Sequence, residues 1–198
     1  MPLPSPRPTA RLDPLAACRI IESYTPVDPV SAHYQEQFLA LIAAHPQDFA
    51  NRYNYELGIH GHFTAQAWVF NPEKRAVGLM QHKKLGLWLG FGGHVEPGDT
   101  DLIACARREA VEESGLRDIT LHSPIPIDLD IHGFPAKGDQ PDHLHYDLRF
   151  LFTTTESTFA PNDESTAIEW VPVVDLPERL KMWLSNSRLV RYSQAHLG

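Results

Sequence analysis

The spacing of apolar residues along the chain changes near residue 60. Before that point, apolar residues of the segment 28–45 recur at helical spacing, at Tyr34, Phe38, Leu41 and Ile42. Asp28 or Ser31 is suited to cap the start of this helix. We therefore predict a helical extension over residues 11–58, preceded by a disordered, proline-rich tail over residues 1–10.

After residue 60 the pattern becomes that of β-strands, because segments rich in aromatic and β-branched residues are separated by turn residues. These segments cover residues 62–71, 76–83, 85–93, 126–132, 143–152 and 168–173. A helix is predicted from about Asp101 to Ser114, where internal Gly and Pro are absent and Gly115 follows. A short helix begins at Asp175. Strands around a central helix predict an α/β or α+β sandwich over residues 59–198.

Alternation in two of the predicted strands separates a polar face from an apolar face. The polar positions are His62, Thr64, Gln66 and Trp68 in one strand and His143, His145, Asp147 and Arg149 in the other. We expect this face to line a cleft in which histidines bind metal or substrate: His60, His62, His94, His143 and His145. The alternative is partly exposed histidines that bond water or backbone groups. Trp68, Trp88 and Phe91 either stack on a base or, as is usual for strand aromatics, belong to the core.

Composition narrows the classes of function. The chain has 198 residues, 42% of them hydrophobic and 21% charged, which suits one globular domain. No apolar run approaches the roughly 18 residues of a membrane-spanning helix. The net charge of −8 argues against a nucleic acid polymer as partner but allows an anionic substrate if a metal ion supplies positive charge. Two cysteines without metal-type spacing predict a cytoplasmic protein.

Three glutamates crowd the end of the predicted central helix. Glu109, Glu112 and Glu113 are three or four residues apart and therefore project from one helix face. Like charges at this spacing repel by about 0.2–0.5 kcal/mol for an exposed pair. A divalent cation turns the same oxygens into ligands. The alternative is a solvated helix face with Arg107 and Arg108 as internal partners.

The glutamates follow a Gly-rich loop, GFGGHVEPGD, and the whole stretch resembles the Nudix box, Gly-x5-Glu-x7-Arg-Glu-U-x-Glu-Glu-x-Gly-U, where U is bulky and apolar. Gly93 matches the first glycine, and residues 108–116 match the second half. Two features depart from the pattern: Asp99 replaces the first glutamate, and eight residues separate it from Arg108. We expect the shorter side chain and the longer spacer to compensate, so that Asp99 or Glu96 still reaches Arg108.

The resemblance covers about residues 62–180, and a Nudix subgroup with a helical extension and a GGH loop is similar. It implies divalent-metal-dependent hydrolysis of a diphosphate linkage in a nucleoside-diphosphate-type or related phosphorylated small molecule, with Mg²⁺ or Mn²⁺ as cofactor. It also implies metal ligation by Glu109, Glu112, Glu113 and a backbone carbonyl of Gly92 or Gly93. Gly93, Asp99 and Gly115 are the structural positions of the box.

Catalytic roles carried over from the resemblance fall on Arg108, Glu112, Glu113 and Glu164. Arg108 is expected to orient a ligand glutamate. Glu164, in a loop that also contains Asp163, is expected to act as an auxiliary ligand or general base. The residues predicted to contact substrate are His62, His94, His143, His145, Arg149 and Lys84, the last two as surface charges near phosphate oxygens.

Two other functions stay open. An isomerase of the isopentenyl-diphosphate type shares the Nudix fold and uses His and Glu ligands, but its catalytic cysteine precedes the box, where this chain has none; Cys105 lies inside the helix. A non-catalytic Nudix module that senses a nucleotide commonly loses box glutamates, which are present here. The helical extension is expected to form a homodimer interface or a lid. The substrate itself is not readable from the box.

Overall fold

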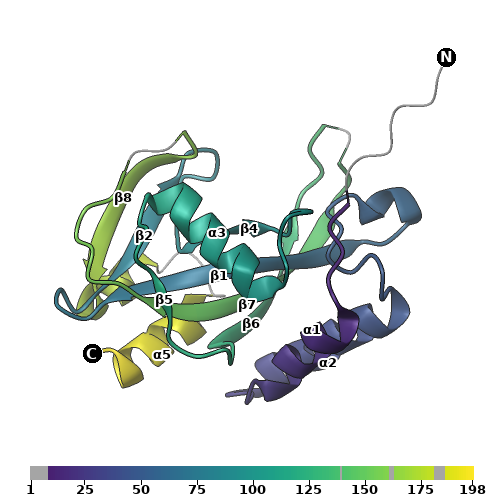
Figure 1. The fold of residues 1–198 in the computed structure, drawn as a ribbon, viewed down its shortest axis with the longest axis horizontal. Helices are drawn as coiled ribbons and strands as arrows, with labels where there is room; N and C mark the ends of the chain where they lie inside the picture. Colours follow the sequence, from purple (N-terminus) through teal and green to yellow (C-terminus); the bar gives the residue numbers. More distant parts are fainter. Residues whose placement is uncertain (1–8, 139, 161–162, 181–185) are drawn as a thin grey trace.

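The computed structural model describes residues 9–138, 140–160, 163–180 and 186–198, and its centre is a mixed sheet of eight strands (Figure 1). The two longest strands, β1 (Gly61–Asn71) and β7 (His143–Thr153), run parallel and pair over ten positions. A parallel pair needs a long connection between its strands. The connection here includes the helix α3 (Leu102–Ser114), so the box lies between the two central strands in sequence.

Each central strand has two partners on its outer edge. Strand β1 pairs first with β4 (Phe91–His94) and, near its end, with β2 (Ala76–His82). The other outer pairs involve β3 (Trp88–Leu89), β5 (Thr120–Leu121), β6 (Asp128–Phe134) and β8 (Ser165–Pro172). Because β1 changes partner from β4 to β2 midway, the sheet opens between these two strands.

Helix α3 begins and ends with clear local signals. The side chain of Asp101 accepts a hydrogen bond from the Ala104 N–H, and the chain leaves the helix at Gly115 with φ of 73°. One face of the helix buries Ala106 and Ala110 in the core beneath β1. The glutamates lie along one side of this buried face, and Glu113 is itself buried, so packing of the small residues fixes where the carboxylates point.

The predicted helical extension consists of α1 (Pro14–Ser23), α2 (Pro29–Ala44) and a short 3-10 helix, η1 (Asn54–Leu57). Asp28 and Ser31 together form a capping box at the start of α2. The extension shares the main core instead of forming its own, because Phe38 packs edge-on against Phe63 and Tyr146 with ring centroids 5.0 and 5.2 Å apart.

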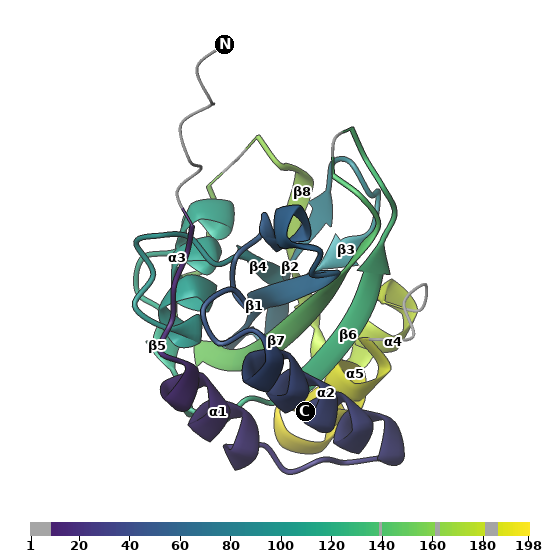
Figure 2. The same cartoon turned by 90° about the vertical axis from the view of Figure 1, so that its right-hand side faces the viewer.

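Two cores lie on opposite faces of the sheet, and Figure 2 shows α3 and α5 (Ser187–His196) on opposite sides of β1 and β7. The second core also receives η2 (Val173–Asp175) and α4 (Leu176–Arg179). Trp68 and Phe91 are fully buried core residues, so neither can stack on a base. Trp88 is half-buried beneath the guanidinium of Arg179, 4.4 Å from its ring centroid.

The predicted α/β sandwich is confirmed, as are the six predicted strand segments and the box helix. Helix α5 was not predicted from the pattern. Residues 1–8 of the predicted tail lie outside the described residues, and Ala10, at its end, is buried in the main core. Within the described residues, no helix has the length and apolar character needed to cross a membrane.

Candidate active site

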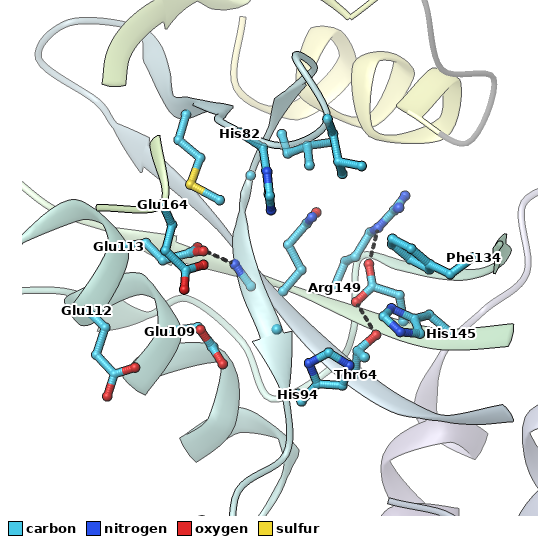
Figure 3. Close-up of a pocket in the computed structure, with 18 of the residues that line it drawn as sticks. Thr64, His82, His94, Glu109, Glu112, Glu113, Phe134, His145, Arg149 and Glu164 are labelled. Carbon is cyan, nitrogen blue, oxygen red and sulfur yellow. Dashed lines mark hydrogen bonds and ion pairs between the residues drawn. The ribbon is translucent and has the colours of Figure 1, made fainter. Parts of the chain in front are cut away.

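A pocket of about 390 Å³ opens beside α3, between β1, β2, β4, β6 and β7 (Figure 3). Its wall includes box residues and the polar face of the sheet. The predicted site residues that line it are Lys84, Gly93, His94, Arg108, Glu109, Glu112, Glu113, His145, Arg149 and Glu164. His62 and His143 lie next to this group but are not part of the pocket wall.

The three helix glutamates occupy different environments. Glu113 is only 6% exposed, and its carboxylate accepts a hydrogen bond from the Gly92 N–H at 2.8 Å. Glu109 lies against Gly93, where a Cβ atom would be 2.6 Å from its Oε1. Glu112 is 58% exposed. A side chain at position 93 would therefore displace the Glu109 carboxylate from its place against the loop.

Arg108 connects the loop half of the box to the helix half. Its Nε and Nη2 donate to the two carboxylate oxygens of Asp99, both at 2.9 Å. Its guanidinium also donates to the His94 carbonyl and Glu109, each at 2.9 Å, and to Glu112 at 3.1 Å. Burial raises the pKa of Asp99, but the hydrogen bonds and charge of Arg108, together with the hydrogen bond from the Glu96 N–H, hold the pKa below its ordinary value.

The expected compensation between the shorter Asp99 side chain and the longer spacer is thus seen as a bidentate contact with Arg108. Glu96 takes a different part: its backbone N–H donates to Asp99 at 2.8 Å. Asp99 therefore ties the loop and Arg108 together. The side chain of Asp99 is only 4% exposed, so the contact is shielded from water.

Burial raises the pKa of two carboxyl groups of α3. Burial and the neighbouring glutamates raise the pKa of Glu113 to about 8, although the Gly92 N–H partly opposes this shift. Burial also raises the pKa of Glu109 despite the contact with Arg108. Without a cation the site tends to hold protons in place of charge, and hard oxygen donors of this kind suit a divalent ion.

Glu164 lies just before β8, and Figure 3 shows its side chain beside Glu113 at the edge of the pocket. Its charge contributes to the raised pKa of Glu113. The Glu164 carbonyl accepts the Lys83 N–H at 2.8 Å, which attaches this loop to the turn after β2. Asp163, the other acid of the loop, is exposed and does not line the pocket.

Three histidines form a tight group at the pocket, and two of them, His94 and His145, line its wall. The ring centroids of His62, His94 and His145 are 4.8–5.1 Å apart. Burial and then the neighbouring histidines lower the pKa of His62 to about 2, and burial and then Arg52 lower the pKa of His94 to about 3. Burial likewise lowers the pKa of His145. All three imidazoles are therefore neutral at pH 7.

Arg149 differs from the prediction. It was expected as a surface charge, but it is 2% exposed and its guanidinium binds three carboxylates: Asp128 at 2.9 Å, Asp130 at 3.2 Å and Asp147 at 2.9 Å. Arg188 from α5 joins the same cluster through Asp130 at 3.0 Å and Asp128. Because its donors bind aspartates, Arg149 holds these side chains in place at the pocket and is badly placed to bind a phosphate.

Sequence reasoning missed several residues of the pocket wall. Arg52 comes from the extension, and His132 and Phe134 come from β6. Gln66 also lines the pocket, as the alternation in β1 predicted. Arg52 has no comparable signal, because its position depends on how the loop after α2 folds back onto the sheet.

Comparisons with known proteins give one consistent result. The NUDIX domain model matches residues 61–192. The oxidized purine nucleoside triphosphate hydrolase of Mus musculus is 37% identical over 82 residues, which are 39% of this chain and 52% of that protein. The chain therefore spans about half the length of this curated relative.

Two solved structures show the same fold. A C. elegans Ap4A hydrolase binary complex aligns with a TM-score of 0.52 at 18% identity, over 68% of this chain and 96% of its own. The NUDIX domain of Shewanella oneidensis NrtR, complexed with ADP ribose, aligns with a TM-score of 0.51 at 16% identity, over 80% of this chain and 98% of its own. The second alignment is long enough to extend beyond the matched NUDIX domain.

Proposed function

The chain belongs to the NUDIX family, and we propose that it hydrolyses a diphosphate linkage in a nucleoside-diphosphate-type or related phosphorylated small molecule, with Mg²⁺ or Mn²⁺. The observation that carries the proposal is the group of three carboxyl side chains that α3 places at the pocket wall, with Arg108 held by Asp99. The hydrolase activity named for the Mus musculus relative supports the same class of reaction.

The residues that would hold the ion are Glu109, Glu112, Glu113 and the Gly93 carbonyl. Their donor atoms are hard oxygens, and the raised pKa of Glu113 indicates an electrostatic environment that a cation would relieve. A bound divalent ion would supply Lewis-acid polarisation of a phosphoryl oxygen and a lower pKa for its bound water. Arg108 holds Glu109 and Glu112 in place by charge-assisted hydrogen bonds.

Other residues of the pocket are proposed to accept the proton of the attacking water and to contact the substrate. Glu164, beside Glu113, is the proposed general base that takes a proton from the attacking water. Lys84 and Arg52 supply positive charge at the pocket wall for the remaining phosphate oxygens. Arg149 acts indirectly, because it orients Asp147, whose carboxylate accepts a hydrogen bond from Thr64 at 3.0 Å.

The isomerase alternative is not favoured. A catalytic cysteine has to form a thiolate next to the substrate, but Cys105 is fully buried and burial raises its pKa. Its Sγ contacts the His94 carbonyl at 3.5 Å, inside the junction between loop and helix. Cytoplasmic location and homodimer formation stay predictions from the sequence.

A screen for product release tests the proposal. Purified protein is incubated with Mg²⁺ or Mn²⁺ and nucleoside triphosphates, nucleotide sugars, dinucleoside polyphosphates, NADH or ADP-ribose. We expect hydrolysis of at least one class, and a loss of about 100-fold or more in Glu112→Gln. Glu36→Gln, an exposed acid on α2, is the matched control and keeps full activity. Absence of hydrolysis across the screen, or equal rates in both variants, refutes the proposal.

A further inference from the structure

We propose that His62, His94 and His145 bind a transition metal ion that prefers nitrogen ligands, at a site separate from the α3 glutamates but in the same pocket region. The inference does not require that the protein hydrolyse a diphosphate. It rests on the backbone that carries the three imidazoles, on the spacing of their nitrogens and on their missing hydrogen-bond partners.

The three histidines come from three neighbouring strands whose register places them together. His62 on β1 pairs directly with His145 on the parallel strand β7. His94 on β4 pairs with Thr64, two residues further along β1 and on the same face of the strand as His62. Ligands on paired strands are held more precisely than ligands on loops, so the sheet preorganises this group.

The nitrogen positions suit coordination of one ion. One ligand atom from each of His62, His94 and His145 lies within 4.8 Å of the other two. Bonds of about 2.1 Å in tetrahedral geometry separate nitrogens by about 3.4 Å. The nitrogens therefore lie somewhat farther apart than a bound ion requires, and rotation of the rings is the movement that would close the gap.

Two of the imidazoles have a nitrogen without a hydrogen-bond partner in the part of the chain that the structure describes. The Nε2 atoms of His62 and His94 are buried and make no hydrogen bond. Buried polar atoms are normally paired, and an exception calls for a ligand or another explanation. Metal coordination would satisfy both atoms at once.

The third imidazole is oriented by its neighbour. The Nδ1 of His143 is 2.9 Å from the Pro141 carbonyl, which only accepts, so this nitrogen carries the proton in the neutral ring. The His143 Nε2 then accepts a hydrogen bond from the His145 Nε2–H at 3.2 Å. That tautomer leaves the lone pair of His145 on Nδ1. A ligand histidine that donates its other N–H to a fixed partner is the usual arrangement at metal sites.

The ligand set indicates the kind of ion. Neutral imidazoles suit zinc, cobalt, nickel or iron, whereas Mg²⁺ prefers oxygen ligands. Three protein ligands leave a coordination position open. His94 and His145 line the pocket, so the open position faces it. Arg52 also lines the pocket and opposes a bare cation, which favours an anion such as phosphate or hydroxide in the fourth position.

Cobalt absorption spectroscopy tests the site without any activity measurement. Chelator-treated full-length protein is titrated with Co²⁺ in excess Mg²⁺, which occupies the oxygen ligands. We expect one equivalent of Co²⁺ to give the strong visible bands of a four- or five-coordinate nitrogen-rich site. His94→Gln and His145→Gln should weaken Co²⁺ binding at least 10-fold. Glu109→Gln and the exposed His122→Gln, as matched controls, should retain it.

Several results would overturn the proposal. One is a weak spectrum typical of octahedral Co²⁺ in wild-type protein, a readout that needs no variant to fold. Another is loss of the bands in Glu109→Gln with retention in both histidine variants, whose folding is checked by circular dichroism. The hydrolase proposal fails separately: Co²⁺ binding without hydrolysis of any substrate would leave the histidine site standing and refute only that activity.

Discussion

Carboxylates from α3 and carboxylates from β6 and β7 lie close to the same pocket, yet they differ in their positive partners. Asp128, Asp130 and Asp147 are at most 5% exposed and share two arginines, Arg149 and Arg188. The α3 group consists of Glu109, Glu112 and Glu113, next to Asp99, and Arg108 is the arginine bound to it.

The difference separates structural acids from acids suited to bind a cation. Burial of a charge is tolerated when opposite charges and hydrogen bonds accompany it, as in the aspartate group. The glutamate group faces the pocket, and Arg108 is the cation whose ion pairs join Asp99, Glu109 and Glu112. Charge balance within the group therefore says more about function than the number of acids does. Each prediction below changes the balance in one of the two groups.

The largest effect is expected when the aspartate group loses its central cation. Arg149→Leu removes the guanidinium that binds all three buried carboxylates, so we predict a loss of about 3–5 kcal/mol in the free energy of unfolding. Urea denaturation followed by fluorescence measures it. Arg149→Lys should restore part of the loss, because it returns the charge without the planar set of donors.

The matched change in the other group is Arg108→Leu. Its guanidinium side chain is 22% exposed and one of its partners, Glu112, is 58% exposed, so we expect less than half of the stability loss of Arg149→Leu and a larger loss of hydrolytic activity. Similar losses of stability in the two variants would contradict the distinction between the groups.

The second prediction concerns the response of stability to Mg²⁺. An ion that binds only the folded protein stabilises it by about 2.7 kcal/mol at 100 times its dissociation constant. We expect Mg²⁺ to raise the free energy of unfolding by this order in wild-type protein and by little or nothing in Glu109→Gln. Thermal denaturation with increasing Mg²⁺ measures it. Asp147→Asn alters the aspartate group, so its stability without Mg²⁺ should be lower than that of wild type. Its gain in stability on addition of Mg²⁺ should equal that of wild type. An equal response in all three proteins would argue against a glutamate site.

The third prediction addresses the unusual spacing in the box. Asp99→Asn removes the charge that holds Arg108, so we expect about a 10-fold loss in kcat/KM, as for residues that orient metal ligands. Asp99→Glu restores the residue of the family pattern but adds a methylene to a site that is 4% exposed. It should be less active than wild type because the spacer already has one extra residue. Activity above wild type in Asp99→Glu would show that the two departures do not compensate.

Local signals allowed much of this protein to be predicted from its sequence. The small residues and end signals of α3, and the alternation in β1 and β7, each depend on a few neighbouring positions. Box spacing placed Arg108 beside an acid even though the acid is Asp99. Each of these features is set by residues a few positions apart in the sequence, so it can be predicted without knowledge of the rest of the fold.

Features that depend on distant segments were not predictable in the same way. The burial of Arg149 requires Asp128 on β6 and Arg188 on α5, which come together only when the second core forms. The pattern of β7 placed Arg149 on a polar face, and that assignment was compatible with either a phosphate contact or an internal ion pair. Strand register, which the sequence does not state, likewise decides that His62 meets His145.

The smallest predicted effect is a pH dependence that belongs to the aspartate group alone. Burial raises the pKa of Asp130, but the charge of Arg149 and the contact with His132 outweigh it and hold the pKa below its ordinary value. A lowered pKa contributes stability that is present above the unfolded value of about 4 and is lost as pH falls below it. We predict that the advantage of wild type over Asp130→Asn shrinks by about 1 kcal/mol between pH 5 and pH 3.

Urea denaturation at pH 5, 4 and 3 with a chelator present measures this difference between wild type and Asp130→Asn. The chelator matters because bound metal would add a pH dependence from the glutamate group. Glu36→Gln, whose acid is exposed on α2, should follow wild type at each pH. If the wild-type and Asp130→Asn curves stay parallel as the pH falls, Arg149 and His132 do not hold Asp130 ionised, and the buried group is not balanced in the way its contacts indicate.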